Sequence, residues 1–254
     1  MSNTFTAHNV RLDDGTETAP QTGGLIADTP WLRAALLVLD TVYPNGLTGL
    51  RIADLGCLEG GYSVEFARRG MDVLGIEARA GNFENCELVR RGLSLPNLRF
   101  ARDDVWNIAS YGSFDAVFCC GLLYHLDRPA SFIRLLSAQT RKVLILNTHF
   151  ATLALNPKFR LGDIVEQDGI KGRWCHEYDE GAADIEAFKW SAWGNHRAFW
   201  ALHEYIPQML RDAGFDLIFE QFDWMGDDIA DSMATGYRAT EDRGMFVGIK
   251  TAER

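Results

Sequence analysis

The sequence predicts an α/β protein built on an open, mostly parallel and doubly wound sheet with helices on both faces. Short apolar segments alternate with helical segments from residue 31 to residue 150. These short segments are mainly apolar and alternate with helices, which is typical of parallel strands covered on both faces. The composition, 47% hydrophobic and 24% charged over 254 residues, suffices for a full globular core and excludes a disordered chain.

The first half of the chain follows this alternation closely. Apolar residues at helical spacing predict a helix over 31–43, which begins after a proline and stops at a Pro-Asn-Gly sequence. A short strand over 50–56 ends in glycine, and a helix over 62–70 follows it. The next expected elements are a strand at 71–78, a helix at 82–91, strands at 97–105 and 114–123, a helix at 130–140 and a strand at 142–150.

Two segments depart from the alternation. Residues 1–30 are polar and contain proline and glycine, so we expect a mobile N-terminal arm that acts as a lid. Residues 31–254 form the main domain, in which residues 151–198 carry aromatic and histidine side chains without a period. We interpret 151–198 as an insertion that caps the substrate side.

The alternation resumes after the insertion. A helix is expected over 198–214, kinked or restarted at Pro207. Strands over 215–224 and 245–250 close the chain, and no clear helical pattern lies between them. The last strand is therefore expected to pair antiparallel.

The charge and the cysteines exclude several classes of protein. The net charge is −10, which disfavours a general nucleic-acid binder and an anionic membrane surface. The acids concentrate in residues 1–30, 151–195 and 223–242. The five cysteines lack Cys-x-x-Cys spacing, and we find no basic-apolar leader and no long apolar run. These features predict a reduced cytoplasmic protein without a zinc site or a membrane span.

Polar groups stand at the ends of three consecutive predicted strands. The first strand ends in a glycine-rich segment, residues 54–61, which reads Asp-Leu-Gly-Cys-Leu-Glu-Gly-Gly. Glycines let the backbone approach a ligand at the carboxyl edge of a sheet. Glu77 closes the second strand, where a carboxylate accepts both hydroxyls of a ribose, and Asp104 closes the third, where it accepts from an adenine amine. The pattern predicts a nucleotide site.

This arrangement resembles the class I S-adenosylmethionine-dependent methyltransferases, closely over 50–150 and loosely over 198–250. Residues 114–126, FDAVFCCGLLYHL, are similar to the fourth-strand motif of that family. The resemblance implies a Rossmann-like, seven-stranded sheet with an antiparallel last strand, and an enzyme that uses S-adenosylmethionine and releases S-adenosylhomocysteine. The expected cofactor-binding residues are Asp54, Gly56, Cys57, Gly60, Tyr62, Glu77, Asp104, Val105, Cys120 and Gly121.

One position departs from the family pattern. Leu58 stands where the family has the middle glycine of its loop, which leaves the loop less open near the methionine part of the cofactor. We therefore expect Glu59, Gly60 and Gly61 to make the close approach instead.

Three histidines are candidate bases for an acceptor hydroxyl. His125 follows the fourth predicted strand, His149 follows the fifth, and His196 precedes the resumed helix. A base near neutral pH is needed if the acceptor is a hydroxyl or phenol, and histidine suits that role. We favour His149 or His196 as the acid–base group and keep His125 as a further candidate.

The insertion supplies candidate substrate-binding residues. Trp174, Trp193 and His176 form the expected wall for a flat acceptor, and packing within the core of the cap is the alternative for the tryptophans. His149, His176 and His196 lack the spacing of metal ligands, so no metal is predicted. Because the arm and the insertion are acidic, we predict an acidic mouth that favours neutral or cationic acceptors.

The predicted function is methyl transfer to an O or N atom of a small molecule, in natural-product biosynthesis. The region from the fourth strand to the end of the insertion also loosely resembles enzymes that alkylate a wobble uridine of transfer RNA. An RNA substrate needs a basic track, which these acidic segments do not offer. A non-catalytic cofactor-binding scaffold is a further alternative. A nicotinamide dehydrogenase is disfavoured because the loop has G-x-x-x-G-G, not G-x-G-x-x-G.

Overall fold

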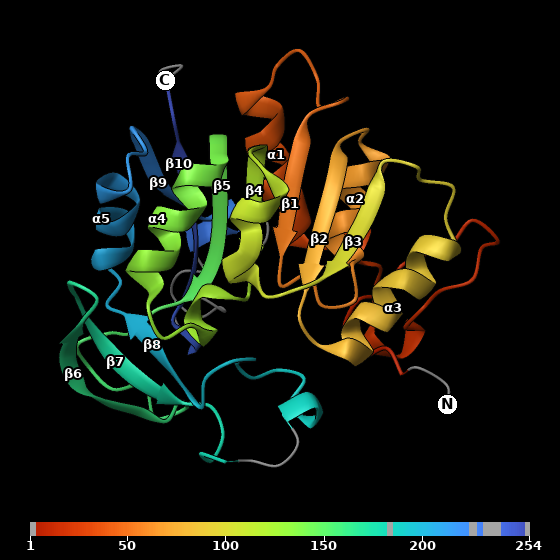
Figure 1. The fold of residues 1–254 in the computed structure, drawn as a ribbon. Coiled ribbons are helices and arrows are strands. Elements are labelled where there is room, and N and C mark those ends of the chain that lie inside the picture. The colour runs from red at the N-terminus through yellow and green to blue at the C-terminus, as the bar shows by residue number, and fades with distance from the viewer. Residues whose placement is uncertain (1–3, 182–184, 224–227, 231–239, 252–254) are drawn as a thin grey trace.

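The computed structural model describes residues 4–181, 185–223, 228–230 and 240–251. Its main sheet has the strand order β3-β2-β1-β4-β5-β10-β9 (Figure 1). Strands β1 to β5 pair in parallel, whereas β10 pairs antiparallel with both β5 and β9. The predicted α/β fold with an antiparallel last strand is therefore confirmed. The seven strands are β1 (Arg51–Leu55), β2 (Asp72–Glu77), β3 (Leu98–Arg102), β4 (Phe114–Cys120), β5 (Thr140–His149), β9 (Leu217–Gln221) and β10 (Arg243–Ile249).

Helices cover both faces of this sheet. Helices α1 (Pro30–Val42) and α2 (Gly61–Arg68) bury Leu39 and Phe66 in the core of one face. Helices α4 (Pro129–Gln139) and α5 (Tyr205–Asp212) bury Phe132 and Leu210 in the core of the other. Helix α3 (Ala80–Arg91) lies beside β3, and short 3₁₀ helices span Pro20–Thr22, Ile26–Asp28, Val105–Tyr111, Leu123–His125 and Ile185–Ala187. Among the described helices, none is both long and apolar enough to cross a bilayer.

The insertion forms a second, smaller sheet. Strands β6 (Leu161–Gln167), β7 (Ile170–His176) and β8 (Arg197–Ala201) pair antiparallel in that order. In Figure 1 this sheet lies below the lower edge of the main sheet, where the arrowheads of β1 and β2 also point. The insertion therefore sits at the carboxyl edge of the parallel strands, where open α/β sheets bind ligands.

The helix predicted over 198–214 is wrong in its first part. Strand β8 occupies 197–201, and helix α5 begins only at Tyr205. Phe199 and Trp200 are large aromatic residues that favour a paired strand, and β7 supplies the partner. Pro207 lies in the first turn of α5, where no intrahelical N–H bond is lost, so it does not kink the helix. Residue 224 of the predicted strand and most of the acidic segment 223–242 lie outside the described residues.

The described part of the N-terminal arm packs against the start of α2. The fully buried Glu59 carboxylate accepts hydrogen bonds from the backbone N–H groups of Thr6, Ala7 and His8 at 2.7, 3.0 and 2.9 Å. Burial lowers the pKa of His8 to about 4, so its ring is neutral at pH 7. The neutral ring accepts the N–H of Gly61 at Nδ1, at 3.0 Å. These bonds fasten residues 6–8 to the loop that follows β1.

Candidate functional site

A cavity of about 610 Å³ opens at the carboxyl edge of the main sheet. Residues after β1 to β4 line one part of it, and the arm, the insertion and the start of β10 line the rest. Eight of the ten predicted cofactor residues line it, namely Asp54, Gly56, Tyr62, Glu77, Asp104, Val105, Cys120 and Gly121. Cys57 and Gly60 do not.

The loop after β1 explains which residues reach the cavity. Leu58 adopts a left-handed backbone with φ of 54°, as the glycine of the family pattern would, and its side chain lines the cavity. A Cβ at Gly60 would lie 2.6 Å from Cζ of Phe100, so Gly60 faces the core. The sulfur of Cys57 lies 3.8 Å from that of Cys86, also in the core. Contrary to the expectation, Glu59 points to the arm and Leu58 stays at the cavity.

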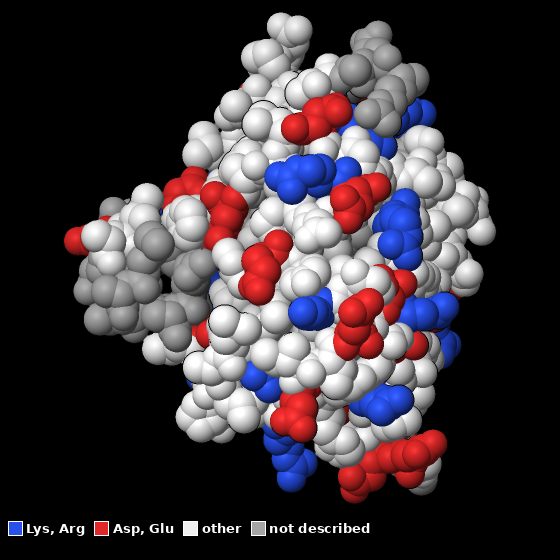
Figure 2. All heavy atoms as spheres, turned by 90° about the vertical axis from the view of Figure 1, so that its left-hand side faces the viewer, with Lys and Arg blue, Asp and Glu red and all other residues white. Residues whose placement is uncertain are grey.

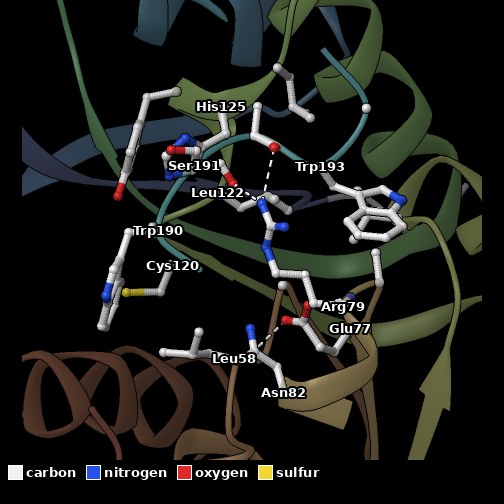
Figure 3. Close-up of a pocket in the computed structure, with 18 of the residues that line it drawn as sticks. Leu58, Glu77, Arg79, Asn82, Cys120, Leu122, His125, Trp190, Ser191 and Trp193 are labelled. Carbon is white, nitrogen blue, oxygen red and sulfur yellow. Dashed lines mark hydrogen bonds between the residues drawn. The ribbon is translucent and has the colours of Figure 1, made fainter. Parts of the chain in front are cut away.

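Glu77 has the geometry of a hydroxyl-binding carboxylate. Its Oε2 accepts the N–H of Leu58 at 3.0 Å, and its Oε1 accepts the N–H of Arg79 at 2.8 Å (Figure 3). A carboxylate accepts about four hydrogen bonds, so beside these two donors and the side chain of Asn82 it keeps capacity for a ligand hydroxyl. Burial raises the pKa of Glu77, and the two backbone donors oppose that rise. The buried Oδ1 of Asn82, another cavity residue, has no protein partner and offers one more acceptor.

Two further carboxylates complete the part of the cavity beside Glu77. Asp54 is buried at the end of β1, and Ser63 Oγ donates to its Oδ2 at 2.6 Å. Burial raises the pKa of Asp54 to about 7. Asp104 accepts the N–H of Trp106 at Oδ1, at 3.0 Å. Three acceptors from consecutive strand ends thus face one cavity, as the nucleotide prediction requires, and the chemistry of this set fits S-adenosylmethionine.

His125 is the only one of the three candidate catalytic histidines that lines the cavity. Its Nδ1 lies 2.8 Å from Oε1 of Glu177, whose side chain is buried. A carboxylate only accepts, so Nδ1 carries a proton, and in the neutral tautomer of this ring the lone pair is on Nε2. The other oxygen of Glu177 accepts the N–H of Ala192 at 3.1 Å. The pair has the composition and orientation of an acid–base dyad, and the sequence alone gave no reason to choose Glu177.

His149 and His196 lie outside the cavity. The Nδ1 of His149 donates to the carbonyl oxygen of Glu241 at 2.6 Å, and its ring stacks on Trp200 with centroids 4.9 Å apart. Burial, aided by the charge of Arg243, lowers the pKa of His149 to about 3. The backbone carbonyl of His196 accepts from Glu177, and its side chain is not part of the wall. The structure does not bring the two favoured histidines to the candidate site.

The pKa of His149 predicts how acid affects stability. In the unfolded chain this histidine takes up a proton near pH 6.5, whereas in the folded protein it stays neutral to about pH 3. The stability it contributes is therefore complete above pH 6.5 and is lost as the pH falls below that value. Lowering the pH from 7 to 5 should reduce the unfolding free energy of the unsubstituted protein by about 2 kcal/mol more than that of His149→Gln, which lacks this titrating group. Denaturant unfolding at both pH values measures this, and a difference independent of pH would contradict it.

The predicted substrate-binding residues separate in the structure. Trp193 lines the cavity, with the guanidinium of Arg79 5.4 Å from its ring centroid. Trp174 packs edge-on against Phe199 at 5.1 Å, so it takes the alternative role in the core of the cap. His176 is on the surface, with Nε2 3.2 Å from Asp179. Among the described residues, no three side chains of His, Cys, Asp or Glu are grouped as metal ligands would be.

Several cavity residues were missed by the sequence reasoning. Arg79 stands two residues after Glu77, so its distance from the strand end was a usable signal. Trp190, an aromatic residue of the insertion expected in the pocket wall or in the core of the cap, was not missed and lines the cavity. No sequence signal identified Tyr124 or Arg243, because only the fold brings them to the same wall.

The described cavity wall carries balanced charge and does not support the predicted acidic mouth, some of whose acids lie outside the described residues. In the insertion, Glu177 is hydrogen-bonded to His125 and to the N–H of Ala192, and Glu186 accepts the N–H of Ala80. In the arm, Glu17 forms an ion pair with Arg11. The wall has as many acidic as basic side chains: Asp54, Glu77, Asp104 and Asp127, and Arg79, Arg128, Lys189 and Arg243. Other acids of the insertion, such as Asp163, Glu166 and Asp179, are exposed and do not line the cavity.

Comparison with known proteins agrees with this geometry. Residues 52–143 match the family model described as a methyltransferase domain. The ubiquinone biosynthesis O-methyltransferase of Acinetobacter baylyi is 30% identical over 125 residues, which cover 48% of this chain and 52% of the relative. That of Psychrobacter cryohalolentis is 32% identical over 143 residues, covering 52% of this chain and 53% of the relative. The chain thus matches about half the length of these curated relatives.

Solved structures share the fold. The N-terminal domain of EvdMO1, crystallised in the presence of S-adenosylhomocysteine and D-fucose, aligns with a TM-score of 0.66 at 22% identity, covering 96% of this chain and 90% of that chain. Magnesium protoporphyrin IX methyltransferase from Synechocystis PCC 6803, with bound S-adenosylmethionine, aligns with a TM-score of 0.53 at 17% identity, covering 87% and 80%. Residues 52–143 therefore match a methyltransferase domain, and the chain shares the fold of these solved structures, in agreement with the motifs of the sequence.

Proposed function

We propose that the protein transfers a methyl group from S-adenosylmethionine to a hydroxyl oxygen of a small molecule. The observation that carries this proposal is the His125–Glu177 dyad, which lies at the cavity beside the predicted cofactor residues. A neutral amine attacks without losing a proton first, whereas a hydroxyl must lose its proton during the reaction. A positioned base therefore favours oxygen over nitrogen as the methylated atom.

The residues after β1 to β3 would hold the cofactor, which supplies a methyl group activated by the positive charge on its sulfur. Glu77 would accept from the ribose hydroxyls, and Asp104 would accept from the adenine amine. Asp54 and Gly56 would contact the methionine part. Two backbone N–H groups already fix the carboxylate of Glu77, so little side-chain freedom is lost on binding.

The chain itself performs the proton chemistry. Nε2 of His125 would take the proton of the acceptor hydroxyl while Glu177 stabilises the resulting imidazolium. Trp190, Trp193 and Tyr124 line the cavity with aromatic surface (Figure 3 shows the two tryptophans). Flat apolar walls exclude water and align a planar acceptor with the methyl group, which is the main contribution a protein makes to such a displacement.

The relatives support a hydroxyl acceptor in a biosynthetic pathway, because the curated ones are named O-methyltransferases of ubiquinone biosynthesis. One structural neighbour was crystallised in the presence of D-fucose. A natural-product acceptor for this chain remains our prediction.

The RNA and scaffold alternatives have weaker support. Figure 2 shows acidic and basic side chains interspersed over the face that carries α4 and α5, without the continuous basic track that RNA binding needs. A non-catalytic scaffold has no need of a buried carboxylate that orients a histidine toward a cavity.

The test has two stages. Calorimetry with S-adenosylhomocysteine should show saturable binding to the folded protein, and its absence would contradict the proposal. The protein is then given donor labelled in the methyl group and a cell extract, with and without ribonuclease. We expect a ribonuclease-resistant small product, and carbon NMR should place its label in a methoxy group. Label that disappears with ribonuclease would favour the RNA alternative, and binding without any product would favour the scaffold.

A further inference from the structure

One peptide group of the insertion connects the two parts of the cavity. Nη2 of Arg79 donates to the carbonyl oxygen of Ser191 at 2.7 Å, and the N–H of Ala192 donates to Oε2 of Glu177 at 3.1 Å. That carbonyl and that N–H belong to the same planar, conjugated peptide group. A cation therefore binds one end of this dipole, and a carboxylate binds the other.

The hydrogen bonds continue from both ends. The backbone N–H of Arg79 donates to Glu77 at 2.8 Å, and the second oxygen of Glu177 lies 2.8 Å from Nδ1 of His125. The hydrogen-bonded series thus runs from the guanidinium of Arg79 to the histidine proposed to take the acceptor proton, and the side chain of Arg79 links it, through the backbone N–H, to Glu77, the carboxylate proposed to hold the ribose. Figure 3 shows Arg79 between Glu77 and the segment that carries Ser191 and Trp193.

Arg79 is well placed to fix this segment. Its guanidinium also donates to the carbonyl of Ile185, and to that of Ala192 at 3.0 Å, and only 4% of the residue is exposed. Hydrogen bonds in such a buried series polarise one another, so a guanidinium on the Ser191 carbonyl strengthens the donor on Ala192. Without it, the carboxylate of Glu177 keeps its partner in His125, but the N–H of Ala192 is a weaker donor and its segment is less firmly held against the second oxygen.

We infer that Arg79 is a positioning residue for methyl transfer, acting through the Ser191–Ala192 peptide and Glu177 on the ring of His125. The inference rests on the proposed function and deepens it. It assigns to Arg79, which stands beside the proposed ribose carboxylate Glu77, a role on the acceptor side of the cavity. Since Arg79 reaches the base only through the Ser191–Ala192 peptide and Glu177, its loss should reduce kcat by a larger factor than it raises the KM of the acceptor.

A double-substitution cycle tests this inference. We expect Arg79→Ala and Glu177→Gln each to lower kcat by about tenfold or more, and the double variant to be no slower than the slower single variant. Arg79→Lys retains a donor for the Ser191 carbonyl, so it should restore part of kcat and keeps the cycle usable if Arg79→Ala does not fold. Glu186→Gln is the matched control, because Glu186 anchors the same segment through the N–H of Ala80, at 3.2 Å, and Arg102. Its kcat should stay unchanged.

Multiplicative losses in the double variant would overturn the inference, as would an effect of Arg79→Ala confined to the affinity for S-adenosylhomocysteine. An equal loss in Glu186→Gln would also overturn it, because general anchoring of the segment would then suffice. Full activity of His125→Asn would instead contradict the proposed function. The two failures are therefore distinguishable.

Discussion

Replacing His125 with asparagine is expected to lower kcat by about a hundredfold to ten-thousandfold, the usual contribution of a positioned general base. Asparagine keeps an N–H that can donate to Glu177, so the carboxylate is not left unpaired. It has no group that takes a proton near neutral pH. Single-turnover kinetics with a saturating acceptor measures the loss directly, and calorimetry with S-adenosylhomocysteine should show unchanged binding.

The control for His125 is another histidine beside a carboxylate. His176 lies outside the cavity with its Nε2 near Asp179, so His176→Asn changes the same side chain in the same kind of pair. Its kcat should match that of the unsubstituted protein. If His125→Asn keeps full activity, another group removes the proton, and the choice of a hydroxyl acceptor loses its main support.

Glu77→Ala is expected to weaken the binding of S-adenosylhomocysteine by roughly a hundredfold or more, because charge-assisted hydrogen bonding to the ribose is lost. The substitution also leaves the N–H groups of Leu58 and Arg79 without their acceptor. Glu77→Gln should not restore binding, because its NH₂ group would face one of these backbone donors. Calorimetric titration gives the dissociation constants of the three proteins.

A control at the opposite end of the same strand separates binding from folding. Asp72 begins β2 and is partly exposed beside Arg51 and Arg99, so Asp72→Asn removes a carboxylate from β2 without touching the cavity. It should bind S-adenosylhomocysteine normally. Binding that survives in Glu77→Ala, in a protein whose melting temperature is unchanged, would contradict the assignment of the ribose site.

The grouping of the predicted cofactor residues at one cavity was predictable from sequence because its determinants are local. Asp54, Glu77 and Asp104 each end a strand, and parallel pairing of neighbouring strands brings such ends to one edge. The order of strands and helices through residue 150 followed from apolar periodicity for the same reason. Each helix and strand in that range is encoded within its own segment.

The acceptor side was not predictable, since its contacts join distant segments. His125 and Glu177 are 52 positions apart, and Arg79 reaches Ser191 across 112. Strand β8 was predicted as helix because its apolar residues fit both periods, and only β7 decides between them. The net charge of a segment likewise did not indicate whether its carboxylates face the cavity or an internal donor.

The hydrogen bonds from Arg79 to the carbonyl groups of the insertion limit which insertions can follow this methyltransferase-like core. Residues 54–105 supply most of the cofactor side as one contiguous stretch, whereas the insertion is a separate unit that could be exchanged for a cap with another acceptor preference. Such an exchange would leave the guanidinium of Arg79 buried without its carbonyl partners unless the new cap presented carbonyls at the same place. A cap graft that ignores this contact should express as a protein that binds the cofactor but turns over slowly. Compatible caps can therefore be selected by one geometric criterion, the carbonyl groups offered to residue 79.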